Sequence, residues 1–221
     1  MPPRTSRRHD ALSTDRIVAA AVEILDVDGE SALTFRALAA RLATGAGAIY
    51  WHVADKDALL SAVTEHVVFR ALPDDEPADA PDVAIRAVAL AIFDAVDAHP
   101  WAGAHLVRHP WQPAMVEIFE RVGRRLTALG VVDDALFCAG STLVNFILGV
   151  AGQNAANARL RPPGADRAAL LDDVAARWRQ YDAQRYPIVH RMAAQLRDHD
   201  DREQFLAGID ILLAGLTPPD R

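Results

Sequence analysis

Residues 33–60 have the sequence LTFRALAARLATGAGAIYWHVADKDALL, and this stretch decides the fold. Thr34 is a residue type that favours the N-cap position of a helix. Leu33 before it and Leu38 four positions after it have the arrangement of a hydrophobic staple, which fixes the entry of a chain into a helix. We therefore expect a short helix that starts after Thr34 and ends by Leu42.

Three residues after that helix, 43–45, form a tight connection to a second short helix over residues 46–52. Asp55 then caps a longer amphipathic helix, and upstream Ser13 caps another that Gly29 ends. Two short helices between two longer ones make a helix-turn-helix unit. A generic helical hairpin is the alternative interpretation.

In residue types and spacing, residues 33–60 resemble the DNA-binding domain of the tetracycline-repressor (TetR) family of bacterial transcription regulators. The segment YWHV, followed three residues later by Lys56, is most similar to the tetracycline repressors themselves. The resemblance extends from about Ser13 to Leu72. It implies a sequence-specific DNA-binding regulator of transcription.

Four positions differ from the family pattern. Ala43 stands where a turn glycine is usual, Thr44 replaces a valine, and Gly45 replaces a serine N-cap. Ala48 replaces a threonine that often contacts DNA. Because of these changes, the base preference of other members cannot be carried over to this chain.

The second short helix, 46–52, is expected to be the recognition helix in the major groove. Its glycines and alanines allow close approach, and alanine offers only apolar contact to thymine methyl groups. Ile49 should point into the core and Trp51 should brace the helix. Arg36, and more weakly Thr44, would make polar base contacts, while tyrosine, histidine and lysine would reach the DNA backbone. The predicted DNA contacts are Arg36, Thr44, Ala46, Ala48, Tyr50, His52 and Lys56.

The charge of the chain is unevenly distributed around a net value of −7. Residues 1–56 contain six arginines, one lysine and seven acids, whereas residues 57–221 contain 16 arginines and 23 acids. A basic arm with Arg4, Arg7 and Arg8 could act locally on DNA. Lys56 is the single lysine beside 22 arginines, and at a helix start it suits a phosphate contact.

Composition also indicates the compartment. Cys138 is the only cysteine, so no intramolecular disulfide and no cysteine metal cluster can form. The N-terminus is basic but is not followed by an apolar run, so it is no secretory signal. We expect a cytoplasmic protein.

The whole chain is predicted to be all-α, since alternating apolar and polar runs are absent. We divide it into a helix-turn-helix domain (1–72), an acidic proline-rich linker (73–81) and a regulatory domain (82–221). The last segments of the chain resemble one group of TetR regulatory domains, which implies ligand binding and homodimerisation. The regulatory helices are expected at 82–98, 101–108, 113–129, 133–159, 166–185, 187–198 and 201–216.

Residues 135–158 carry no formal charge, which raises the question of a membrane span. Polar residues such as Thr142, Asn145 and Gln153 disfavour that alternative. We prefer the interpretation that this is a helix of a soluble protein, buried on several faces. We expect no membrane among the partners of the protein. The final helix is placed at a dimer interface through Ile209, Leu212 and Leu216.

Aromatic residues cluster in the middle of the chain, where they suit either a core or a pocket for a largely apolar small molecule. The candidate ligand contacts are Phe93, Trp101, His105, Trp111, Met115, Asn145 and Phe146. A metal at His99, His105 and His109 is a weaker alternative to a core-bonded or solvent-facing histidine pair. We predict no metal and no other cofactor.

These features favour a homodimeric repressor that a small molecule releases from a palindromic double-stranded operator. A DNA-binding regulator or activator without a ligand is the first alternative. An all-α enzyme or ligand carrier is the second. Metalloprotease, phosphate-binding and nucleophile-elbow motifs are missing from the sequence, so we predict that the protein is not an enzyme.

Overall fold

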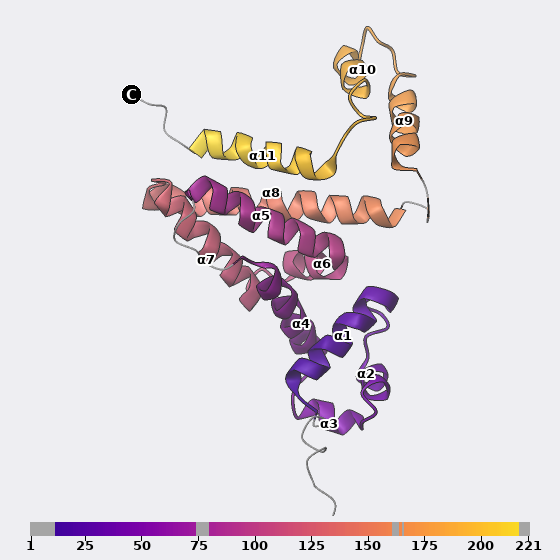
Figure 1. Cartoon of the computed structure of the whole chain (residues 1–221), viewed down its shortest axis with the longest axis vertical. Helices are drawn as coiled ribbons and strands as arrows, with labels where there is room; N and C mark the ends of the chain where they lie inside the picture. The colour runs from indigo at the N-terminus through magenta and orange to yellow at the C-terminus, as the bar shows by residue number, and fades with distance from the viewer. Residues whose placement is uncertain (1–11, 74–79, 161–163, 165, 217–221) are drawn as a thin grey trace, which may run out of the picture. The chain divides into compact units, whose positions relative to one another are not determined.

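The computed structural model describes residues 12–73, 80–160, 164 and 166–216. All the regular secondary structure in those ranges is α-helical (Figure 1). The predicted all-α class is confirmed. The chain forms two compact units, residues 1–152 and 153–221, and each is described by itself. The predicted linker at 73–81 falls within the first unit, and residues 74–79 lie outside the described ranges.

Four helices build the helix-turn-helix unit: α1 (Thr14–Asp28), α2 (Phe35–Arg41), α3 (Ala46–Tyr50) and α4 (Lys56–Ala71). The predicted N-caps before α1, α2 and α4 are confirmed by side-chain bonds. Ser13 accepts from the Arg16 amide at 3.3 Å, Thr34 from the Ala37 amide at 3.1 Å, and Asp55 from the Ala58 amide at 2.8 Å. Local sequence thus sets where these helices begin.

The core of this unit is a continuous apolar cluster contributed by all four helices. Ile49, from α3, is fully buried, as predicted, and so anchors α3 to the core. Trp101 and Ala102, from the next domain of the chain, belong to the same cluster. The helix-turn-helix unit is therefore packed directly against the larger half.

The larger half begins with α5 (Pro81–Ala98), α6 (Pro100–Arg108) and α7 (Pro113–Ala128), which match the predicted ranges to within one residue. Each starts with proline at the first helical position, where the missing N–H costs nothing. Helix α4 contacts all three (Figure 1). It is thus the structural connection between the helix-turn-helix unit and helices α5, α6 and α7.

Helix α8 (Asp133–Leu160) runs across the division between the two units at Gly152. One face is buried through residues such as Leu143 and Ile147, and the opposite face exposes Cys138, Thr142, Asn145 and Gly149. That exposed face is uncharged, as predicted. Among the described residues, α8 alone is long and apolar enough to cross a bilayer by length and composition, a test that soluble core helices also pass.

The second unit contains α9 (Arg167–Trp178), α10 (Pro187–Ala193) and α11 (Asp201–Leu216). The predictions of helix up to residue 185 and up to residue 198 were wrong. After α9, the Asp182 carboxylate accepts the Gln184 amide at 2.7 Å, so a side chain competes with the helical bond. Pro187 then disfavours helical backbone at the residue before it.

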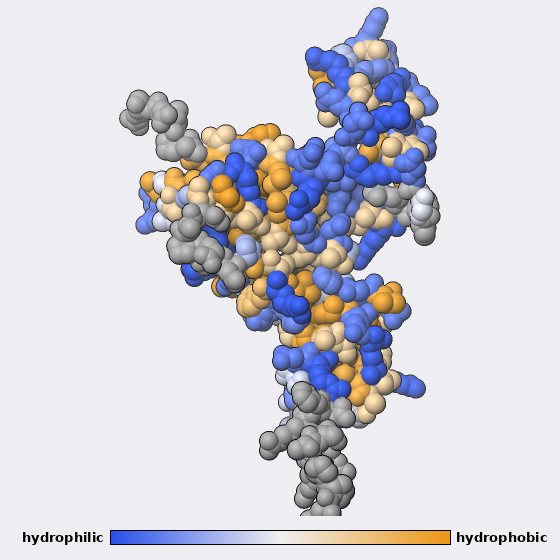
Figure 2. Space-filling model, in the orientation of Figure 1, coloured by the Kyte–Doolittle hydropathy of each residue, from blue (hydrophilic) through white to orange (hydrophobic). Residues whose placement is uncertain are grey.

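Apolar side chains remain on the surface of both units (Figure 2). Phe137 and Leu160 of α8 and Ile211 of α11 are among the most exposed large apolar side chains, with Ile211 73% exposed. By contrast, Ile209 is fully buried within a single chain, which takes it away from the dimer surface assigned to it from the sequence. Leu212 and Leu216 are half-buried.

Candidate nucleic-acid interface

The turn between α2 and α3 requires an unusual backbone conformation. Ala43 has φ +50°, in the left-handed region that costs a residue with a Cβ about 1–2 kcal/mol. The Thr44 amide donates to the Ala39 carbonyl at 3.0 Å and closes the turn. This conformation explains why a glycine is usual here in the family that residues 33–60 resemble.

Helix α3 is fixed to α2 by an aromatic stack between Phe35 and Tyr50, whose ring centroids lie 4.3 Å apart with the planes at 4°. The Tyr50 side chain remains 55% exposed. The sequence-based prediction gave Tyr50 only a backbone-contacting role. Its second role, orienting α3, was missed because the partner, Phe35, lies 15 positions away on another helix.

The outer surface of α3 is bare backbone at two positions. A Cβ built on Gly45 or Gly47 would meet no heavy atom within 4 Å, and neither residue has a positive φ. The fold therefore does not require glycine at either position. The open space suits a partner that must approach the backbone closely. Ala46 and Ala48, between and after them, are half-buried.

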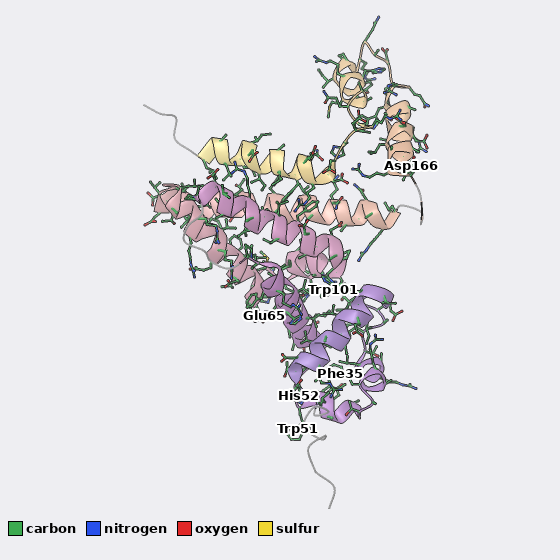
Figure 3. The ribbon with its side chains drawn as sticks, viewed as in Figure 1. Phe35, Trp51, His52, Glu65, Trp101 and Asp166 are labelled. Atoms are coloured by element: carbon green, nitrogen blue, oxygen red, sulfur yellow. The ribbon has the colours of Figure 1, made fainter. Side chains whose placement is uncertain are left out.

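Trp51 and His52 are exposed at the end of the helix-turn-helix unit (Figure 3). The prediction that Trp51 braces α3 was wrong, because its side chain is 91% exposed. Helix α3 ends at Tyr50, so Trp51 is its C-cap and is not held on the inward face. Trp51 therefore joins the residues available for contact with DNA.

Arg36 projects from α2 and makes no ion pair with any residue that the structure describes. Arg41 on the same helix is different, since its Nε donates to the Glu23 carboxylate at 2.8 Å. Arg41 therefore ties α2 to α1, whereas the Arg36 guanidinium remains available for a partner. Thr44, the weaker base-reading candidate, is half-buried.

Lys56 has a structural bond that the sequence did not reveal. Its Nζ donates to the Glu30 backbone carbonyl at 2.7 Å, which fastens the start of α4 to the segment after α1. An ammonium has three donors, so the bond leaves others for a phosphate. The Glu30 carboxylate accepts from Arg108 of α6 at 2.6 Å, and this bond holds the pKa of Glu30 below its usual value.

A second link joins α1 to α6 through Asp26. Its Oδ1 accepts from the Trp101 indole at 2.7 Å and pairs with Nδ1 of His99 at 2.8 Å. Trp101 is buried, and its one polar atom is used in this bond. Trp101 therefore has a structural role in the contact between the helix-turn-helix unit and α6, and its assignment to a ligand pocket stays a prediction.

The other six ligand candidates occupy dissimilar environments. Phe93 and Met115 are buried, Phe146 is half-buried, and Asn145 is exposed. Trp111 is 75% exposed, which removes it from the wall of an enclosed pocket in a single chain.

His105 is the candidate with distinctive chemistry. It is only 2% exposed, yet neither ring nitrogen has a hydrogen-bond partner among the described residues. Burial and the neighbouring His109, whose ring lies 4.5 Å away, lower the pKa of His105. The described residues contain no group of three His, Cys, Asp or Glu side chains able to hold a metal ion.

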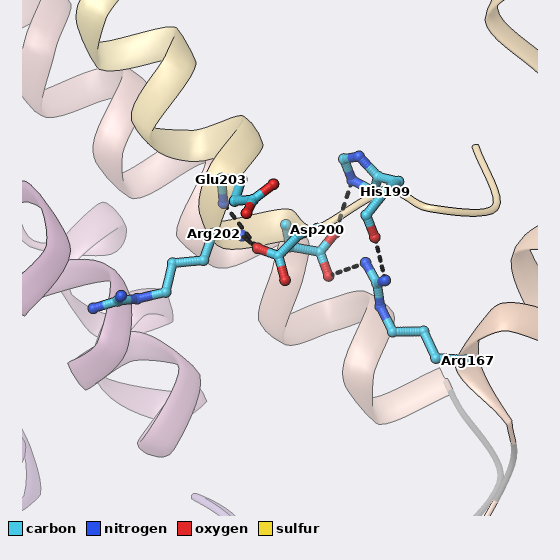
Figure 4. A network of polar contacts seen from close by, with 6 residues as sticks. Arg167, His199, Asp200, Arg202 and Glu203 are labelled. Atoms are coloured by element: carbon cyan, nitrogen blue, oxygen red, sulfur yellow. Dashed lines mark hydrogen bonds and ion pairs between the residues drawn. The ribbon is translucent and has the colours of Figure 1, made fainter. Parts of the chain in front are cut away.

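A polar cluster in the second unit has a structural role (Figure 4). The Asp200 carboxylate accepts the amides of Arg202 and Glu203 at 2.9 and 2.8 Å, and these bonds lower the pKa of Asp200. Arg167 donates to Asp201 at 2.8 Å and to the His199 carbonyl. The cluster caps α11 and joins it to the start of α9.

Helix α3 is exposed and presents open backbone at two glycines, and Arg36 beside it has no partner among the described residues. A larger helical domain is joined to this unit. These features are typical of a DNA-binding regulator of the helix-turn-helix class. Residues 17–63 match the family described as bacterial regulatory proteins, tetR family, and residues 73–218 match the tetracyclin repressor-like C-terminal domain. The chain belongs to the TetR family of bacterial transcriptional regulators.

Solved structures of the family share its architecture. The regulator SCO7222, a TetR protein from Streptomyces coelicolor, is 50% identical with a TM-score of 0.87, over 96% of this chain and 100% of that one. ActR from S. coelicolor, solved in complex with actinorhodin, is 27% identical with a TM-score of 0.77, over 93% and 95%. BioQ from Mycobacterium smegmatis, solved with its double-stranded DNA operator, is 26% identical with a TM-score of 0.66, over 94% and 99%.

Proposed function

We propose that this regulator is a cytoplasmic homodimeric repressor that binds a palindromic operator through α3 and is released by a small molecule. The observation that carries the DNA-binding role is the open backbone at Gly45 and Gly47 on the outer face of α3. Major-groove recognition needs close approach of a helix to base edges. Gly47 lies within α3, where glycine lowers helix stability, so solvent exposure alone would not select it. Gly45 is the N-cap, where glycine is tolerated.

The contacts divide between base edges and the DNA backbone. Arg36 has no partner among the described residues and suits a bidentate bond to guanine, and the two small alanines offer contact to thymine methyl groups. Tyr50, His52 and Lys56 suit phosphates, and the exposed Trp51 ring suits the sugar or methyl surface beside them. The basic arm at Arg4, Arg7 and Arg8 lies outside the described residues and stays a prediction.

Dimerisation is supported by surface that a single chain leaves apolar and uncharged. The exposed face of α8 presents Cys138, Thr142, Asn145 and Gly149, and α11 exposes Ile211. Closed two-fold assembly is the commonest way to bury such faces. A two-fold dimer of helix-turn-helix units reads two half-sites about one helical turn apart, which is why the operator should be palindromic.

A small-molecule effector is supported by unmet polar groups at the end of α6. Both ring nitrogens of His105 and the Oε1 atom of Gln112 are buried without hydrogen-bond partners among the described residues. Each unmet group costs about 1–3 kcal/mol, which a ligand that bonds it would recover. ActR, a relative with a bound small molecule, and BioQ, a relative with bound operator, support both halves of the proposal.

The decisive experiment is a fluorescence anisotropy titration of the full chain on duplexes from its own upstream region, with a shuffled duplex as control. We expect a dissociation constant on the order of 10⁻⁸ M or tighter for the operator and at least about 10³-fold weaker binding to the shuffled duplex. A compound library is then screened for release of the complex. Equal affinity for both duplexes would contradict the proposal. Specific binding that no compound releases would favour a regulator without a ligand.

A further inference from the structure

We propose that the groove between α1, α4 and α5 is a second ligand site, for a small amphipathic organic anion with an apolar ring and one carboxylate. The groove has a volume of about 410 Å³, and all its lining residues lie in the first compact unit. Its apolar wall comes from Ala19 and Val22 of α1, Val67 and Ala71 of α4, and Ala95 and Ala98 of α5.

The shape of the groove follows from small side chains at helical spacing. Residues 19 and 22, 67 and 71, and 95 and 98 are three or four positions apart, so each pair lies on one face of its helix. Four of the six are alanine, which leaves space between the three helices. Val67, Ala71 and Ala95 also line the closely packed interior beneath, so the floor is continuous with the apolar core.

Arg70 selects the charge of the ligand, and two histidines beside it offer further hydrogen bonds. His66 and Arg70 lie one turn apart on α4 and line the groove, and neither bonds any residue that the structure describes. His99 lines the groove from the end of α5 and uses Nδ1 to bond Asp26, which leaves Nε2 for another partner. An arginine with no bonding partner among the described residues, beside an apolar floor, fits a carboxylate with an apolar body.

This groove is separate from the proposed effector site, since none of the predicted effector contacts lines it. Its effect on DNA rests on the proposed function. A ligand here would touch α1 of the helix-turn-helix unit and α5 of the larger half at once. A ligand that binds one arrangement of these helices more tightly than the other would change operator affinity, and the operator would change ligand affinity by the same factor.

The test uses 2-naphthoate as the probe and the neutral 2-naphthamide as its isostere, titrated calorimetrically into the full chain. We expect naphthoate to bind at least about tenfold more tightly than naphthamide, because only the carboxylate accepts a charge-assisted bond from Arg70. Arg70→Gln should weaken naphthoate binding about tenfold or more. Ala98→Leu, at an exposed position, should fill the groove and weaken both probes.

Arg124→Gln is the matched control, since it removes the same charge from an exposed site on α7. It should leave naphthoate binding unchanged, and thermal melting should show that all three variants are folded. The proposal is overturned if naphthoate does not bind at millimolar concentration, if naphthamide binds equally well, or if either groove variant retains wild-type affinity. Naphthoate binding without operator binding would support the groove and contradict the proposed function instead.

Discussion

Phe35 and Tyr50 stack face to face across the helix-turn-helix, with ring centroids 4.3 Å apart and planes at 4°. Helix α3 has only five residues and buries a single side chain, Ile49. So short a helix is not stable by itself. Its orientation in the unit therefore depends on this stack together with Ile49.

Removing Phe35 should loosen α3. We expect Phe35→Ala to lower the free energy of unfolding by about 1–3 kcal/mol. This loss is smaller than for a fully buried phenylalanine, because Phe35 is half-buried. Operator affinity should fall as well. Urea unfolding and anisotropy measure the two effects. Tyr50→Phe keeps the stack and should preserve stability. Wild-type stability in Phe35→Ala would show that the stack is unimportant.

Gly47→Ala separates the needs of folding from those of DNA binding. A Cβ at position 47 meets nothing in the chain, so the free energy of unfolding should stay constant or rise by up to about 1 kcal/mol. Operator affinity should nevertheless fall about tenfold, because the methyl group occupies space needed by the DNA. Gly123→Ala, at an equally open position on α7, should raise stability without changing operator affinity. Wild-type operator affinity in Gly47→Ala would contradict the assigned role of this surface.

Arg36→Ala should cost about 1–3 kcal/mol of operator binding and relax the choice of base at one position in each half-site. Lys56→Ala should instead weaken all sequences alike and reduce the salt slope by about one. Anisotropy on matched and single-base-altered operators at several salt concentrations distinguishes the two. Arg124→Ala, far along the chain on α7, serves as the control for lost charge. An even loss across every base change in Arg36→Ala would make Arg36 a phosphate contact.

Stability should fall on acidification because of His105. Burial lowers its pKa in the folded chain below the usual value of 6.5, so the unfolded chain binds more protons just below that pH. The free energy of unfolding should thus be highest above pH 6.5 and decrease below it, by at most about 1.4 kcal/mol per pH unit for one proton. Urea midpoints between pH 8 and 5.5 measure the slope. His105→Gln should flatten it, and an unchanged slope in that variant would assign the effect to another group.

Dimerisation should depend on Ile211 and not on Ile209. Ile211→Glu places a charge on an exposed position of α11 and should give folded monomers in sedimentation velocity at micromolar concentration. Ile209→Glu buries a charge within one chain and should unfold the protein. A fully dimeric Ile211→Glu would place the interface elsewhere, and a monomeric wild-type protein would contradict the dimer altogether.

Local sequence by itself determined the helix starts at Ser13, Thr34 and Asp55, the buried position of Ile49 and the all-α class. Capping and apolar periodicity act over three or four residues, so a single stretch of chain contains all the information that they need. The failure near residue 185 came from the same short range, where Asp182 and Pro187 outweighed helical periodicity. The end of α10 at Ala193, before the predicted residue 198, has no such local cause.

Only the tertiary structure decided which side chains are exposed and free to bind a partner. Trp51 is exposed, Trp101 is held by Asp26, Lys56 bonds the Glu30 carbonyl and Ile209 is buried. In the two side-chain bonds, the partners lie 75 and 26 positions apart in the chain. Such contacts depend on how helices pack, and burial and hydrogen bonding are properties of that packing. Residue types alone therefore identified the surface that we propose faces DNA, but not the bonds that hold the helix-turn-helix unit together and join it to α6.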